Sequence, residues 1–141
     1  MVGIDLSDNL LHGEIPEALF RQKNIEYLNL SYNFLEGQLP RLELPRLKAL
    51  DLSHNSLSGQ VTGNVSTPPG LTLLNLSHNC FSGIVTEKEG LGKFPGALVG
   101  NRSFVWNLQE TSVILQTLMQ QERKYIRTSW WKDLYRFGYS V

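Results

Sequence analysis

The chain of 141 residues carries equal numbers of acidic and basic side chains, so its formal net charge at neutral pH is zero. A balanced charge gives no general attraction for nucleic acid or for an anionic membrane surface. The length allows one modest domain or a short stretch of a repeat array. The single cysteine, Cys80, excludes an intrachain disulfide.

A ten-residue motif occurs four times in the first part of the chain, over residues 4–13, 28–37, 50–59 and 74–83. The asparagines of the four copies are 24, 22 and 24 residues apart, at Asn9, Asn33, Asn55 and Asn79. A period in this range, with leucines at constant positions, indicates a solenoid of leucine-rich repeats. We therefore predict a short α/β solenoid with a parallel β-sheet on the concave face and an irregular or 3₁₀-helical convex side.

The first repeat begins with alternating side chains that predict a short strand, with Ile4 and Leu6 inward and Asp5 outward. Asn9 should turn inward, where its amide can satisfy backbone groups of the bend. Repeated in each coil, these asparagines would form a hydrogen-bonded ladder. Gly13 follows where a close turn favours a residue without Cβ. The return segment 18–24 has room for one helical turn.

The later repeats follow the same template with small departures. Residues 25–40 meet every position, and Pro45 in the next return segment argues against a long helix there. In the third repeat Thr62 replaces the proline, and residues 63–70 predict a polar loop. The fourth repeat covers residues 71–85. We expect repeats over residues 1–90, an end-of-array segment at 91–101, and a divergent tail of low order at 102–141.

The fuller pattern L-x-L-S-x-N-x-L-x-G-x-I-P is nearly complete at residues 4–16 and 28–40. It resembles the plant extracellular class of leucine-rich repeat receptor-like proteins. This resemblance implies a scaffold that binds peptides or proteins and works with receptor kinases or pseudokinases in developmental, meristem-related signalling. It implies a plasma-membrane or extracellular location, although the chain shows neither a signal peptide nor a transmembrane segment. The alternatives are a soluble inhibitor resembling polygalacturonase inhibitors and a non-functional truncated gene product.

The chain departs from this class after Asn101. Residues 93–101 resemble the end of such arrays, where the family continues with Gly-Asn-Pro into a cysteine-paired cap. Here Arg102 follows instead, and all three tryptophans lie in residues 102–141. Moving the reading frame back by one nucleotide can restore the proline and two spaced cysteines. Residues 102–141 are therefore either out-of-frame sequence or a lineage-specific extension, and a transcript read across the Asn101 codon distinguishes the two.

Binding is expected on the concave face, through the residues that point outward in successive coils. Tyr32 beside His54 is the predicted anchor, because aromatic side chains are enriched at binding hot spots. The predicted face comprises Asp5, Ser7, Asp8, Glu26, Asn29, Tyr32, Lys48, Asp51, His54, Thr72, Asn75 and His78, with Ser31, Ser53 and Ser77 also expected outward.

Asparagines in N-x-S/T sequences are candidates for N-glycosylation, and the chain has them at Asn29, Asn64, Asn75 and Asn101. No group of residues has the spacing of a zinc site, and no phosphate loop, nucleophile elbow or kinase signature occurs. We therefore expect no metal, no cofactor, no catalytic residue and no nucleic-acid partner.

Overall fold

The computed structural model describes residues 1–61, 67–85 and 90–106, which form a solenoid of parallel strands. The first sheet consists of β1 (Val2–Asp5), β3 (Ile25–Asn29), β5 (Ala49–Asp51) and β7 (Leu73–Asn75), in that order. Leu28, Leu50 and Leu74 stand in register across it. This is the sheet that the repeat period predicts, and its outward side is the concave face.

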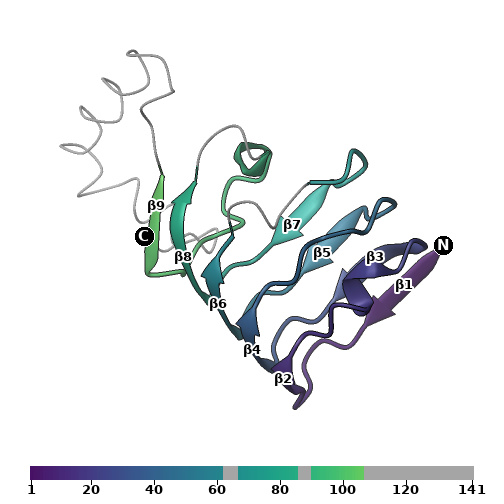
Figure 1. The fold of residues 1–141 in the computed structure, drawn as a ribbon, viewed down its shortest axis with the longest axis horizontal. Helices are drawn as coiled ribbons and strands as arrows, with labels where there is room; N and C mark the ends of the chain where they lie inside the picture. Colours follow the sequence, from purple (N-terminus) through teal and green to yellow (C-terminus); the bar gives the residue numbers. More distant parts are fainter. Residues whose placement is uncertain (62–66, 86–89, 107–141) are drawn as a thin grey trace.

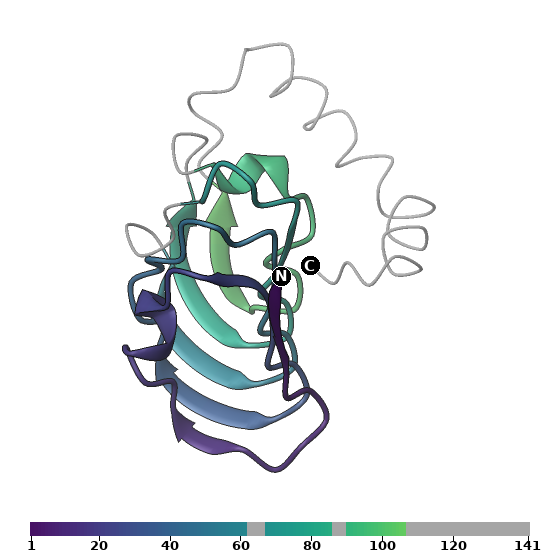
Figure 2. The same ribbon diagram turned by 90° about the vertical axis from the view of Figure 1, so that its right-hand side faces the viewer.

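A second parallel sheet, which the sequence had not predicted, lies beside the first (Figure 1). Its strands are β2 (His12–Glu14), β4 (Phe34–Gln38), β6 (Ser56–Gln60), β8 (Cys80–Val85) and β9 (Ser103–Trp106). Each strand begins one to three residues after a ladder asparagine. Figure 2 shows these strands stacked coil upon coil along the array.

The asparagine ladder connects the two sheets. Asn79 donates its amide to the carbonyls of Leu52, 3.0 Å away in the preceding coil, and of Leu76, 3.2 Å away in its own coil. Its Oδ1 accepts the backbone N–H of Leu57 at 3.0 Å, just inside β6. Asn33 and Asn55 bond in the same way. The ladder therefore holds the point at which the chain passes from the first sheet to the second.

The glycine of each repeat lies within the second sheet. Gly37 has φ +81°, a conformation that favours glycine, and a Cβ there would lie 2.7 Å from Cγ of Glu14 in the neighbouring coil. Gly59 is similar, with φ +84° and a Cβ position 3.0 Å from Gln38. The glycines therefore allow adjacent coils to approach closely, in strands rather than in the close turn that we had expected.

Between the sheets and the return segments lies one continuous apolar core. Leu50, Leu52 and Leu57 are almost completely buried, and so are the two large side chains Phe20 and Phe81. Phe20 belongs to η1 (Leu19–Arg21), the single 3₁₀ turn in the first return segment. Each coil buries its apolar side chains against its neighbours, as expected for a repeat array.

A fifth coil follows the four predicted repeats. Its described residues from 90 onward include η3 (Leu91–Lys93) and turns, and none of them adds a strand to the first sheet. The carbonyls of Ala97 and Val99 accept the backbone N–H groups of Leu76 and His78, both at 2.7 Å. The second sheet then continues in β9, which pairs with β8 from Ser82 to Val85.

The predicted boundary after Asn101 therefore lies inside this fifth coil. Residues 103–106, which we had assigned to the tail, supply a strand, while residues 107–141 lie outside the described residues. The loop residues 62–66, including Asn64, lie outside them as well.

Candidate functional site

The concave face presents three rows of side chains that cross the strands. Because successive coils stack in register, each row repeats one position of the motif. The apolar row contains Tyr27, Ala49 and Leu73. The polar row contains Asp5, Asn29, Asp51 and Asn75. The aromatic row contains Tyr32, His54 and His78.

The apolar row is absent from the sequence-based prediction. Tyr27 and Leu73 are 40% and 49% exposed, and they align with Ala49 in the register of the sheet. Strand alternation could have found them, since each directly precedes an inward leucine.

The polar row is held in place by local hydrogen bonds. Oδ1 of Asp51 accepts the backbone N–H of Ser53 at 2.9 Å, and Asp5, Asn29 and Asn75 accept the equivalent N–H groups at 2.9–3.1 Å. The hydrogen bonds from Ser7 hold the pKa of Asp5 below its usual value. Between coils, the amide of Asn75 donates to Oδ2 of Asp51 at 3.3 Å.

The serines of the motif are buried rather than displayed on this surface. Ser31, Ser53 and Ser77 are buried, with 5%, 2% and 8% of their surface exposed. The outward positions expected for them are therefore wrong. The chain bends inward after each polar-row residue, whose side chain accepts a hydrogen bond from the serine N–H. Ser7, in the first coil, is half-buried, whereas the other three serines are buried.

One ion pair lies beside the apolar row. Nζ of Lys48 contacts Oε2 of Glu26 at 2.7 Å, and the hydroxyl of Thr72 donates to the carbonyl of Lys48 at 3.1 Å. The Lys48 ammonium lowers the pKa of Glu26, and the carboxylate raises the pKa of Lys48. The two charges therefore form an ion pair between adjacent coils.

The aromatic row is a continuous stack of rings. The ring centroids of Tyr32 and His54 are 4.1 Å apart, and those of His54 and His78 are 4.3 Å apart. These residues and Asp8 share a left-handed backbone, with φ between 52° and 55°. The sequence placed these residues before the ladder asparagines on one face, but the stacking depends on coil spacing and the unusual φ.

The stack changes how His54 titrates. Burial and the nearby His78 lower the pKa of His54 from its ordinary 6.5, and Asp51 opposes the shift. A histidine whose pKa is lowered by folding stabilises the protein above the unfolded pKa, and this contribution is lost as the pH falls through the folded value.

We expect the free energy of unfolding to decrease as the pH falls below 6.5. The His54→Gln variant should show a weaker decrease, while His12→Gln, outside the stack, should behave like the parent. Urea denaturation between pH 7.5 and 5.5 measures this. Asp5 and Glu26 have lowered pKa values and titrate below this range. Parallel pH profiles for the parent and His54→Gln would contradict the assignment.

Asn101 is a fifth member of the ladder. Its Nδ2 donates to the carbonyls of Leu76 at 3.0 Å and Leu98 at 2.9 Å, and its Oδ1 accepts the N–H of Phe81 at 2.9 Å. Only 7% of Asn101 is exposed. The structure therefore contradicts its prediction as a glycosylation acceptor, because Nδ2 is the atom to which the glycan would be attached. Its distance of 22 residues from Asn79 could have revealed its ladder role.

The folded chain secreted from a glycosylating host should carry no glycan on Asn101. Peptide mass spectrometry after enzymatic deglycosylation in heavy-oxygen water measures the occupancy of each acceptor. Ser103→Ala removes the acceptor sequence but keeps the asparagine, so it should not change the glycan pattern. A glycan on Asn101 in the folded fraction would show that the fifth coil opens. Asn29 and Asn75 remain predicted acceptors, and both are half-buried.

A depression of about 390 Å³ lies at the end of the concave face. Its walls include Asp51 and Asn75 from the polar row, His54 and His78 from the aromatic row, and Leu73 from the apolar row. The fifth coil closes it with Pro95, Gly96 and Ala97. The three rows therefore meet at this depression.

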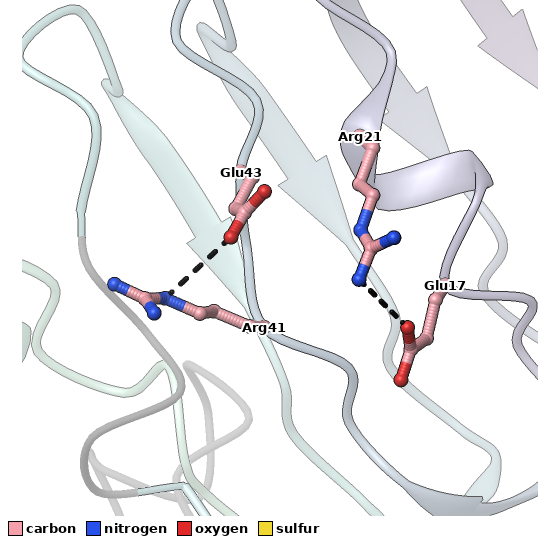
Figure 3. A network of polar contacts seen from close by, with 4 residues as sticks. All are labelled: Glu17, Arg21, Arg41 and Glu43. Atoms are coloured by element: carbon pink, nitrogen blue, oxygen red, sulfur yellow. Dashed lines mark hydrogen bonds and ion pairs between the residues drawn. The ribbon is translucent and has the colours of Figure 1, made fainter.

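The return segments carry charged pairs of a different kind. Arg21 contacts Glu17 at 2.9 Å and Arg41 contacts Glu43 at 3.8 Å (Figure 3). The side chains of Glu17 and Arg21 are 71% and 64% exposed. Exposed pairs of this type contribute little to stability. Because these residues lie outside the concave rows, they provide control positions for substitutions on that face.

The part of the chain that the structure describes contains no group of three or more potential metal ligands. In the same residues, no helix has the length and apolar character needed to cross a membrane.

Comparison with known proteins identifies the class. The family model for the Leucine Rich Repeat matches residues 24–42, 46–67 and 70–88. Over these residues the chain therefore consists of leucine-rich repeats. It is 94% identical over 102 residues to Receptor-like protein CLAVATA2 of Arabidopsis thaliana, a match that covers 72% of this chain and 14% of that protein. By this similarity the chain corresponds to a fragment of a plant receptor-like protein.

Solved structures show the same architecture. The ectodomain of the receptor kinase SOBIR1 from Arabidopsis thaliana aligns with a TM-score of 0.64 at 32% identity, covering 73% of this chain and 59% of that one. The Arabidopsis HAESA ectodomain, solved with an IDA peptide hormone ligand, aligns with a TM-score of 0.64 at 36% identity. That alignment covers 76% of this chain and 18% of HAESA.

Proposed function

We propose that this chain is a ligand-binding stretch of a plant cell-surface receptor-like protein and that its concave face binds an extended peptide. The observation that carries the proposal is the three-row face itself. Tyr27 and Leu73 on the parallel sheet and Tyr32 in the bend that follows it are each at least 40% exposed, on either side of a polar row. Exposed apolar side chains grouped beside polar groups are typical of an interaction surface.

The arrangement fits an extended chain that crosses the strands. Such a ligand could place apolar side chains over Tyr27, Ala49 and Leu73 while its backbone lies over the amides of Asn29 and Asn75. Large curved or flat sheets of repeat proteins bind extended partners in this manner. The HAESA ectodomain, which shares this fold, has been solved with a peptide hormone.

The role we assign is recognition without catalysis. The relative with 94% identity is a receptor-like protein, and the concave rows contain no nucleophile hydrogen-bonded to a base among the described residues. By the same similarity, a receptor kinase or pseudokinase would transmit the signal, at the plasma membrane. No cofactor is required for this role.

A displayed library of random peptides, selected on the full 141-residue chain, tests the peptide-binding function. Selected peptides should bind Tyr27→Ala and Leu73→Ala at least about tenfold more weakly, because each substitution removes an exposed apolar contact. Glu17→Ala and Arg21→Ala, on a return segment, should leave binding unchanged. Peptides that bind the concave variants as well as the parent would overturn the proposal.

A further inference from the structure

The depression exists because the fifth coil has small residues where earlier coils have larger ones. Leu52 donates to the carbonyl of Asn75, and Leu76 donates in the same way to the carbonyl of Ala97. Ala97 thus occupies the polar-row position of the fifth coil. Gly100 precedes the ladder asparagine there, so it occupies the aromatic-row position. Both rows therefore end at residues too small to fill the space beyond Asn75 and His78.

Gly100 also determines where the aromatic row ends. It has φ +75°, and a Cβ there would lie 2.5 Å from Nδ1 of His78. The ring of His78 therefore rests against the backbone of Gly100 on one side and against His54 on the other. Tyr32 covers the other face of His54, so the edges of the His54 and His78 rings, rather than their faces, are directed to the depression.

The charge of the surrounding surface is negative. Lys48 is the one basic residue in the predicted concave set, and it is paired with Glu26. Within residues 1–61, 67–85 and 90–106, Asp5, Asp8 and Asp51 have no lysine or arginine within ion-pair distance. Asp51 is the one of these that lines the depression, where Oδ2 receives a single 3.3 Å hydrogen bond from Asn75.

We infer that this depression binds an arginine side chain of the peptide ligand, an inference that rests on the proposed peptide-binding function. Oδ2 of Asp51 would accept from the guanidinium, and the acceptor nitrogens of the His54 and His78 imidazoles would take further N–H groups. A guanidinium has five donors in one plane, which suits several acceptors spread along a wall. The alkyl part of the side chain would pack on Leu73 and Ala97.

A lysine side chain is the alternative cation. Its ammonium is a compact, strongly hydrated charge with three donors, so it can pair with Asp51 but loses more hydration in a half-enclosed site. We therefore expect arginine to be preferred over lysine, and both to be preferred over citrulline, which has nearly the shape of arginine but no charge.

The test uses the peptide acetyl-Gly-Arg-Gly-amide and its citrulline and lysine counterparts, titrated into the full chain. The ring C–H signals of His54 and His78 in proton–carbon correlation spectra report occupancy of the depression. The arginine peptide should shift these signals in a saturable manner. The citrulline peptide should need at least about tenfold higher concentration for half-saturation, because it lacks the charge-assisted bond.

Two matched variants locate the effect. Asp51→Asn should weaken arginine binding about tenfold and leave citrulline binding unchanged. It should fold, because Asn29 and Asn75 occupy the same position in the adjacent coils. Asp5→Asn makes the same change at the other end of the polar row and should bind arginine like the parent.

The outcomes separate this inference from the function on which it rests. Equal half-saturation by the arginine and citrulline peptides, no saturable shift, or unchanged binding by Asp51→Asn would overturn the arginine site. Library peptides that depend on Tyr27 and Leu73 would still support peptide binding in that case. If the library peptides bind Tyr27→Ala and Leu73→Ala as well as they bind the parent, the peptide-binding function itself is overturned.

Discussion

Replacing Asn79 with alanine is expected to lower the free energy of unfolding by about 3 kcal/mol. The substitution removes the acceptor for the buried N–H of Leu57 and the donor to the carbonyls of Leu52, Leu76 and Ser77. An unpaired buried backbone group costs about 1–3 kcal/mol, and several lose a partner here. Urea denaturation followed by circular dichroism measures the change.

Asn9→Ala is the matched control for the ladder. Asn9 is exposed and donates to two carbonyls of its own coil, Leu6 and Ser7, so water can replace its hydrogen bonds. The loss at Asn9 should be below about 1 kcal/mol. Equal losses for the two variants would show that the asparagine acts locally and that bonding between coils contributes little.

Phe81→Ala is expected to destabilise the chain by about 3–5 kcal/mol. Phe81 is completely buried in the core, and its backbone N–H is held by Asn101 in the fifth coil. Truncation leaves a cavity in the apolar core. Denaturant midpoints for the parent and variant give the difference.

Phe34→Ala provides the comparison for aromatic truncation. Phe34 follows a ladder asparagine directly and is 61% exposed, so its loss should cost less than about 1 kcal/mol. Phe81→Leu should cost less than Phe81→Ala, because Leu35 and Leu57 occupy the same motif position in the earlier coils. A small loss for Phe81→Ala would mean that the fifth coil is not packed on the array.

The periodic part of the molecule could be predicted from sequence because its contacts repeat with the period of the motif. The spacing of Asn33, Asn55 and Asn79 predicts stacked coils, and Leu28, Leu50 and Leu74 predict the buried side of the first sheet. The second sheet was missed because Gly37 and Gly59 resemble turn residues. Their strand role depends on the close approach of Glu14 and Gln38 from neighbouring coils.

The candidate site shows the same division. Most polar and aromatic residues of the concave face follow from their positions in the motif, but Tyr27 and Leu73 are absent from the predicted face, and the buried Ser53 is placed on it. The prediction of Asn101 as a glycosylation acceptor depends only on the three-residue acceptor sequence from Asn101 to Ser103. The hydrogen bonds of Asn101 join residues 20 to 25 positions away.

By itself the sequence determined the repeat period, the identity of the inward leucines and the asparagine ladder, because each is specified within one coil and its immediate copy. Tertiary structure alone decided the ring stack of Tyr32, His54 and His78, the fifth coil and the depression beside Asp51. These depend on how far apart the coils lie and on what the last coil lacks. The role of the small residues Ala97 and Gly100 becomes apparent only when they are compared with the larger residues at the same positions of the preceding coil.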